Sequence, residues 1–235
     1  MTDLDRLIDL HGPALICDAL RPLMTEQRLA RIEQVLDARL TSLVTIVEDL
    51  YDPHNGAAAI RSTEALGLQD FHACEGVHRF AVNDGVTKGC HRWLDLHRWP
   101  ALPPCADALR ARGFKVYATA PDAPVDLDHI DVSAPIAVVF GNEHAGVSDA
   151  GFAACDGTVS IPMFGFTESF NLSVSVALVM SRLAARRREV LGRRGDLPDE
   201  RRDRLRARWY GLGIRGAVGV IERHVSAGTR PVVAP

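Results

Sequence analysis

Short apolar segments that alternate with helical ones constrain the fold of this 235-residue chain more than any other feature. Apolar runs that suit one strand each occupy residues 43–47, 70–74, 115–119, 136–140 and 158–161. Helical periodicity is found between them, at residues 56–66 and 106–112. Strands that alternate with helices pair mainly in parallel, because each helix carries the chain back across the sheet. The sequence therefore predicts an α/β fold with a mainly parallel sheet and helices on both faces.

Further helices are predicted on both sides of this region. Residues 1–24 have the pattern of one or two short helices with a break at Gly12-Pro13, and Thr25 is a candidate N-cap for a helix over residues 26–39. A long helix is predicted at residues 171–188 and a final one at about 200–224. The predicted domains are a helical N-terminal extension (1–40), an α/β domain (41–190) and a helical C-terminal extension (191–235).

Three polar segments follow predicted strands and are candidate binding loops. The first runs from Asp52 to Gly56 and continues to Arg61; the second covers residues 140–146; the third covers residues 161–165 and ends at 169–173. In α/β proteins, ligands bind in loops outside the carboxyl ends of the strands. The order of the segments predicts one site assembled from three loops.

In these three segments the sequence resembles the SpoU (TrmH-type) RNA 2'-O-methyltransferases of the SPOUT class, and the resemblance extends over roughly residues 25 to 190. It implies a trefoil-knotted α/β fold, S-adenosylmethionine as the methyl donor and a homodimer. Within the class, the sequence most resembles the enzymes that methylate guanosine 18 in the D-loop of transfer RNA. That narrower resemblance rests on residues 28–39, on residues 113–119 and on a basic tail after the third segment.

The resemblance also implies roles for individual residues. The cofactor pocket is expected to be lined, largely through backbone atoms, by Thr119, Gly141, Ile161, Met163 and Phe170. Relatives usually have Leu at the position of Phe170, so this residue departs from the family pattern.

The residues expected to act on the ribose are Asn55, Arg61, Glu143, Ser169 and Asn171. Arg61 either clamps an RNA phosphate or helps to relay the hydroxyl proton, and clamping suits it better because an Arg side chain is a poor general base. Glu143 is an alternative base. Taken without the resemblance, Asn, Ser and Glu in such loops often serve only as helix caps and turn residues.

The distribution of charge favours an RNA partner, although the net charge is −3. Between Arg182 and Arg215 there are twelve Arg and five acidic residues. We expect Arg28, Arg31, Arg186 and Arg187 to bind tRNA phosphates, and we expect Arg28, Arg31 and Arg39 to point mostly away from the apolar stripe of their helix. A solvated, Arg-rich helix face would give the same pattern.

Other classes of site and location are not indicated. The five Cys include no C-x-x-C pair and the nine His no metal-ligand spacing, so reduced thiols and no metal are expected. No apolar run approaches the ~18 residues of a membrane span, and acidic residues occur through the first twenty, so a cytoplasmic location is expected. Gly211, Gly213 and Gly216 have dinucleotide-loop spacing but follow a predicted charged helix instead of a strand.

Two alternatives remain open at this point. The same chemistry could act on ribosomal RNA, although relatives of that kind often have a larger N-terminal RNA-binding domain. The chain could also be a non-catalytic RNA-binding relative, but the presence of all five candidate catalytic residues argues against this.

Overall fold

The computed structural model describes residues 2–80 and 87–228, which form two compact units. The larger unit, residues 39–196, contains the sheet; the smaller contains the described parts of residues 1–38 and 197–235 and is helical. Both predicted helical extensions therefore contribute to one helical unit.

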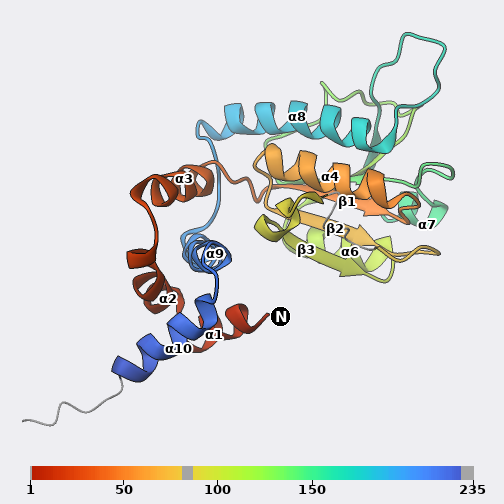
Figure 1. The fold of residues 1–235 in the computed structure, drawn as a ribbon. Coiled ribbons are helices and arrows are strands. Elements are labelled where there is room, and N and C mark those ends of the chain that lie inside the picture. Colours follow the sequence, from red (N-terminus) through yellow and green to blue (C-terminus); the bar gives the residue numbers. More distant parts are fainter. Residues whose placement is uncertain (1, 81–86, 229–235) are drawn as a thin grey trace, which may run out of the picture. The chain divides into compact units, whose positions relative to one another are not determined.

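A six-stranded sheet forms the centre of the larger unit, with all strands parallel and the order β3-β2-β1-β5-β4-β6. Figure 1 labels its neighbouring strands β1, β2 and β3. The strands are β1 (Leu43–Glu48), β2 (Asp70–Cys74), β3 (Asp95–Trp99), β4 (Lys115–Thr119), β5 (Ile136–Phe140) and β6 (Gly157–Val159). This confirms the predicted α/β class and mainly parallel sheet. The trefoil knot stays a prediction from the resemblance.

Strand β3 was missed by the sequence analysis. Its sequence, Asp-Leu-His-Arg-Trp, has no apolar run, because it is the edge strand and every one of its residues is partly accessible or exposed. Strand β6 ends at Val159, two residues earlier than predicted, so Ile161 belongs to the following loop. The predicted strand overlapped that loop because Ile161 continues the apolar pattern.

Helices cover both faces of the sheet, as predicted. Helices α4 (Pro53–Ala65) and α8 (Leu172–Leu191) pack on the face that carries Leu43 and Val47, whereas α6 (Leu102–Ala111) packs on the face that carries Val44 and Ile46 (Figure 1). The alternation along β1 follows from the two-residue period of a strand, and each face contributes one hydrophobic core. A short helix, α7 (Asp149–Ala153), begins after the second candidate loop.

The helical unit contains α1 (Asp3–His11), α2 (Pro13–Leu20), α3 (Glu26–Asp37), α9 (Asp199–Leu212) and α10 (Ala217–Gly228). The break at Gly12 is confirmed, and the Thr25 hydroxyl accepts a hydrogen bond from the Arg28 N–H as the N-cap of α3. The single helix predicted at about 200–224 is wrong: the chain breaks between Leu212 and Ala217, where Gly216 has a left-handed backbone (φ 73°).

The glycines at this break have packing roles. A Cβ atom at Gly211 would lie 2.5 Å from the Leu4 side chain, and one at Gly213 would lie 2.6 Å from the Arg28 guanidinium. Gly211 lies in the last turn of helix α9 and Gly213 is its C-cap, so a helix and not a strand precedes them, as expected.

The prediction for Arg39 is also wrong. Helix α3 ends at Asp37, and the Arg39 side chain is fully buried in the larger unit. Its guanidinium contacts the Glu64 carboxylate at 2.8 Å and donates to the Leu68 carbonyl at 2.9 Å. A buried cation needs such partners, so Arg39 connects the segment before β1 to the end of α4.

Among the described helices, none is both long enough and apolar enough to cross a bilayer.

Candidate active site

A cavity of about 250 Å³ opens at the carboxyl ends of β4, β5 and β6. Its wall contains residues from the end of β4, from the loop after β5, from the loop after β6 and from the start of α8. All five residues predicted to bind the cofactor line it: Thr119, Gly141, Ile161, Met163 and Phe170. The predicted catalytic residues Glu143 and Ser169 line it as well. The structure therefore brings two of the three predicted loops around one cavity.

The loop after β5 is closed so tightly that Gly141 has no room for a side chain. A Cβ atom there would lie 2.1 Å from the Gly146 carbonyl carbon and 2.2 Å from the Val147 nitrogen. The Asn142 and Gly146 backbones exchange two hydrogen bonds, of 2.9 and 2.8 Å, and Gly146 has a left-handed backbone (φ 69°). Gly141 and Gly146 thus contribute only backbone atoms to the cavity wall.

Asn142 is a structural residue of the site that the sequence analysis did not assign. Its side-chain amide donates to the Asp49 carbonyl at 2.6 Å, and its Oδ1 accepts the His144 N–H at 2.8 Å. It therefore connects the loop after β1 to the loop after β5. The sequence feature that could have identified Asn142 is its position between Gly141 and Glu143, in the second candidate loop.

A chain of hydrogen bonds joins one residue from each of the three loops. The Asn171 Nδ2 donates to the Asn55 Oδ1 at 3.0 Å, and the Asn55 Nδ2 donates to the Glu143 Oε1 at 2.8 Å. The Glu143 carboxylate also accepts the backbone N–H groups of Tyr51 (3.2 Å) and Asp52 (3.4 Å). Asn55 is thereby held at both ends of its amide, and Glu143 acts as an acceptor for three donors.

Capping accounts for part of this polar chemistry, as the alternative interpretation expected. The Asp52 carboxylate accepts the His54 N–H at the start of α4, and the Asn171 Oδ1 accepts the Ser173 N–H at the start of α8. Asn171 performs both tasks, because its Oδ1 caps the helix and its Nδ2 holds Asn55. Capping therefore does not replace the contact between the loops.

Arg61 is exposed on α4 and lies outside the Asn171–Asn55–Glu143 chain. Across residues 2–80 and 87–228, the structure gives it neither a hydrogen bond nor an ion pair. Its charge acts on Cys90 in the short 3-10 helix η2 (Cys90–Trp93): burial raises the pKa of the Cys90 thiol, and the Arg61 charge opposes that rise. An exposed guanidinium of this kind is available to an external anion.

The four Arg residues predicted to bind RNA are placed in two different ways. Arg28 and Arg31 are exposed on α3. Arg186 instead donates to the carbonyls of Leu127 and Ile130, both at 2.8 Å. The loop after β4 therefore already occupies the Arg186 guanidinium.

Arg187 is only 7% exposed and donates to the carbonyls of Val132 and Ser133 and to the Ser42 hydroxyl. We therefore correct the prediction for Arg186 and Arg187, whose guanidiniums hold the loop at residues 127–133. A run of three Arg in the sequence cannot show which of them faces the protein interior.

The basic tail is likewise largely internal to the helical unit. Arg202 and Arg206 form ion pairs with Glu33 on α3, and Arg204 forms one with Asp9 on α1. Hydrogen bonds from Arg206 and Arg202 lower the pKa of the Glu33 carboxyl. These three Arg residues of the basic tail therefore connect α9 to α3 and α1.

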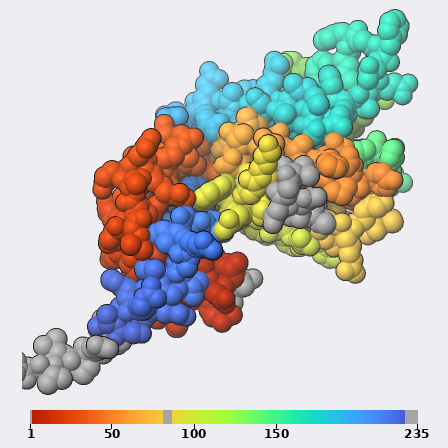
Figure 2. All heavy atoms as spheres, viewed as in Figure 1, coloured from red at the N-terminus to blue at the C-terminus, as the bar shows by residue number. Residues whose placement is uncertain are grey.

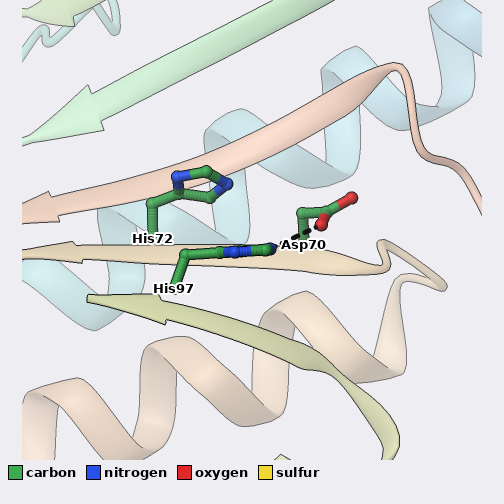
Figure 3. Close-up of side chains that lie close together, drawn as sticks. All are labelled: Asp70, His72 and His97. Carbon is green, nitrogen blue, oxygen red and sulfur yellow. Dashed lines mark hydrogen bonds and ion pairs between the residues drawn. The ribbon is translucent and has the colours of Figure 1, made fainter. Parts of the chain in front are cut away.

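A second polar cluster consists of Asp70 and His72 on β2 and His97 on β3 (Figure 3). It is the one group among the described residues whose ligand atoms are close enough to hold a metal ion, all lying within 4.8 Å of one another. The sequence gives no sign of this cluster, because strand pairing, and not sequence spacing, brings His97 beside His72.

The donors around this cluster favour a structural role. The His97 Nε2 lies 2.8 Å from the Asp70 carboxylate, and the Trp99 Nε1–H donates to the His72 Nδ1 at 3.0 Å. With its Nδ1 accepting that hydrogen, a neutral His72 carries its own proton on Nε2, which then has no lone pair for a metal. The expectation that the protein uses no metal stays a prediction.

Comparisons with known proteins agree with this geometry. Residues 42–181, more than half of the chain, match the model of the SpoU rRNA Methylase family. A tRNA (guanosine(18)-2'-O)-methyltransferase of Borreliella burgdorferi is 36% identical over 167 residues, which cover 71% of this chain and 77% of the relative.

Two solved structures are similar in fold. The A. aeolicus TrmH/SpoU tRNA modifying enzyme superposes with a TM-score of 0.71 at 26% identity and covers 81% of this chain and 98% of that one. The SpoU methyltransferase AviRb from Streptomyces viridochromogenes, in complex with the cofactor AdoMet, has a TM-score of 0.58 at 25% identity and covers 65% of this chain and 62% of that one. Both the sequence match and the fold lead to one conclusion: the chain belongs to the SpoU rRNA methylase family.

Proposed function

We propose that this protein is an S-adenosylmethionine-dependent 2'-O-methyltransferase that acts on guanosine 18 in the D-loop of transfer RNA. The observation that carries the proposal is the Asn171–Asn55–Glu143 chain, which joins three loops beside a cavity lined by all five predicted cofactor residues. The choice of transfer RNA is supported by the Borreliella burgdorferi relative and the A. aeolicus structure, both named for tRNA.

The cavity fits the proposed cofactor in its chemistry. Its lining combines apolar side chains, such as Val159, Ile161 and Met163, with the backbone of the Gly141 loop, where a Cβ atom would collide with the Gly146 carbonyl carbon. An adenosyl group needs apolar contact for its ring and backbone groups for its polar edges. When bound, S-adenosylmethionine supplies an electrophilic methyl group.

Polar side chains of the protein then orient the ribose and its phosphate. Asn55 is held in one amide orientation by Asn171 and Glu143, so it can present a fixed polar edge to a ribose hydroxyl, together with Ser169 at the cavity wall. The exposed Arg61 suits a phosphate clamp. We assign Glu143 to positioning Asn55, because three N–H groups already donate to its carboxylate.

Contacts with the body of the transfer RNA are proposed for exposed Arg residues. Arg28 and Arg31 lie on α3, and Arg193 and Arg194 lie on the segment after α8. When Arg residues neutralise RNA phosphates, the affinity falls as the salt concentration rises. The slope of log affinity against log salt concentration, called the salt slope here, reflects the number of phosphate contacts. Replacing Arg28 and Arg31 together by Ala should reduce tRNA affinity and the salt slope while cofactor affinity is unchanged. Normal tRNA binding by this variant at several salt concentrations would overturn the assignment.

A homodimer is proposed from an exposed apolar surface. Phe164 and Phe166 are essentially fully exposed on the loop before α8, and Val174 and Leu178 are more than 40% exposed on α8 itself. In Figures 1 and 2 this loop projects from the larger unit and α8 lies at its surface. Surfaces of this kind usually bind another protein surface. We propose a second copy as the occupant, which would bring the interface next to Phe170 in the cavity wall.

The oligomer is tested by analytical ultracentrifugation of the wild type and of a Phe164→Ser, Leu178→Ser variant. A dimer that dissociates in the variant supports the proposal, whereas a wild-type monomer at micromolar concentration contradicts it.

The function is tested by transfer of labelled methyl from S-adenosylmethionine to unmodified tRNA and, separately, to ribosomal RNA, with the nucleotide mapped by mass spectrometry. Label as 2'-O-methylguanosine in the D-loop supports the full proposal. Label only in ribosomal RNA, the substrate in the family's description, would retain the chemistry and change the substrate. Cofactor binding without label on any RNA would favour the non-catalytic alternative.

A further inference from the structure

Tyr51 is an exposed aromatic residue at the edge of the candidate active site. Its side chain is 56% exposed, although aromatic rings are usually buried when a core is available to them. It immediately precedes Asp52, the N-cap of α4, and its backbone N–H donates to the Glu143 carboxylate at 3.2 Å. The ring is therefore attached to the same backbone that holds Glu143 in place.

Two imidazole rings lie against Tyr51. The His78 ring is 5.2 Å from the Tyr51 ring, centre to centre, at an interplanar angle of 90°. The His144 ring is 5.1 Å from it at 71°. Both are edge-to-face contacts, which restrict the orientation of the tyrosine without burying it. His144 also lines the cavity, so the three rings extend from the cavity wall to the surface.

The two histidines are held by the loops of neighbouring strands. The backbone N–H of His78 donates to the Asp49 carboxylate at 2.7 Å, and the His78 Nδ1 lies 3.2 Å from the same carboxylate. The backbone N–H of His144 donates to the Asn142 Oδ1 at 2.8 Å. Asn142 also donates to the Asp49 carbonyl, so the backbones of both histidines are connected through one pair of residues. Asp49 has a left-handed backbone (φ 49°), which is unfavourable for a residue other than glycine. The rings follow β1, β2 and β5, which are adjacent in the sheet.

We propose that Tyr51 is the platform on which the nucleobase of the methylated nucleotide stacks. The proposal rests on the proposed RNA 2'-O-methyltransferase function. A ribose that enters the site must bring its base out of the RNA stack, and unstacked bases in RNA–protein complexes are typically received by aromatic or imidazole rings. The ring cluster formed by Tyr51, His78 and His144 lies beside the Asn171–Asn55–Glu143 chain, because the Tyr51 backbone N–H donates directly to the Glu143 carboxylate. Stacking accepts any base, so Tyr51 determines that the nucleotide is unstacked and not which base it carries.

The first experiment compares Tyr51→Leu and Tyr51→Phe in steady-state methyl transfer to an unmodified tRNA. Tyr51→Leu removes the ring but keeps an apolar side chain, and we expect KM for tRNA to rise roughly tenfold because one base–aromatic stack is lost. Tyr51→Phe should restore a KM close to that of the wild type, since the hydroxyl is not needed for stacking. S-adenosylmethionine affinity, measured by calorimetry, reports whether the variants fold. Phe152→Leu removes another partly exposed ring, on α7, and serves as the matched control.

The second experiment separates stacking from a general loss of structure. The substrate is an RNA that lacks only the base of the target nucleotide and keeps its ribose. If Tyr51 receives that base, removal of the base should cost the wild type roughly tenfold in kcat/KM but cost the Tyr51→Leu variant little, because both changes remove one interaction. Independent, multiplying losses would overturn the proposal.

Two further outcomes are distinguishable. An active wild type with a Tyr51→Leu variant of equal KM contradicts the stacking platform alone. A wild type that transfers methyl to no RNA contradicts the proposed function, and the platform with it.

Discussion

The Asn55 side-chain amide donates to the Glu143 carboxylate at 2.8 Å, across a separation of 88 residues in the sequence. The contact forms because β1 and β5 are neighbours in the sheet, so the loops at their carboxyl ends meet. It is the central link of the chain that also includes Asn171. A link of this kind can be tested by removing either partner.

Glu143→Gln should lower kcat by tenfold or more while S-adenosylmethionine affinity changes little. The amide group of Gln places a donor where Tyr51, Asp52 and Asn55 already donate, and losing one hydrogen bond to a charged group costs about 1.5–3 kcal/mol. If Glu143 acts by positioning Asn55, the Asn55→Ala and Glu143→Gln effects on kcat will not add. Fully additive effects would instead favour Glu143 as the general base.

Arg61→Lys and Arg61→Ala should both abolish measurable turnover, with cofactor affinity close to the wild type. The exposed guanidinium is proposed to hold a phosphate through two parallel hydrogen bonds, which an ammonium group cannot reproduce. Single-turnover methyl transfer and calorimetry measure the two effects. Arg112→Lys, an exposed residue before the amino end of β4, is the matched control. Wild-type turnover in either Arg61 variant would contradict the assignment.

Gly141→Ala should weaken S-adenosylmethionine binding by tenfold or more and lower the melting temperature. The added Cβ would lie 2.1 Å from a backbone carbon, so the loop after β5 must open. Gly165→Ala, in the loop after β6, is the control, because a Cβ at Gly165 meets no atom within 4 Å. Calorimetry and thermal unfolding measure both variants, and equal behaviour of the two would show that the loop tolerates the side chain.

Arg187→Leu should reduce the free energy of unfolding by about 3 kcal/mol, because it leaves the buried Val132 carbonyl, the partly buried Ser133 carbonyl and the Ser42 hydroxyl without their donor. The loss should appear in urea unfolding and leave the salt slope of tRNA binding unchanged. Arg182 lies on the same helix as Arg187 and forms an exposed ion pair with Asp128. Arg182→Ala removes this pair and should lower the free energy of unfolding by about 1 kcal/mol or less. If the Arg187 variant were fully stable and bound tRNA with a smaller salt slope, the original prediction that Arg187 binds an RNA phosphate would be correct.

The helical unit should lose stability in acid through Glu33. Hydrogen bonds from Arg206 and Arg202 lower the pKa of Glu33 in the folded protein, so its contribution is complete above its unfolded pKa and is lost as pH falls through the folded pKa. The contribution is about 1 kcal/mol or less, since the carboxylate is partly exposed. Fluorescence of Trp209, which is buried in α9, reports unfolding of this unit. Glu33→Gln should flatten the dependence of stability on pH below the ordinary pKa of a Glu carboxyl. An unchanged slope would assign the acid sensitivity to other groups.

The sequence by itself determined the class of fold, the three loops and the residues around the cavity. Apolar runs identify buried strands because both faces of such strands are covered, and glycine and polar residues after a strand identify loops. Gly141 illustrates the strength of this signal, since its lack of a Cβ is required by backbone packing that any chain with this loop would share.

Only the tertiary structure decided which polar side chains are available. Arg28 and Arg187 look alike in the sequence, yet one is exposed on α3 and the other is buried against carbonyls from a distant loop. Strand β3 was missed, and with it the pairing of His97 with His72, because an edge strand needs no apolar run. The position of Tyr51 between His78 and His144 likewise depends on three strands being neighbours. Hydrophobic patterns are local, whereas the partner of a charge or a ring is set by which loops the sheet brings together.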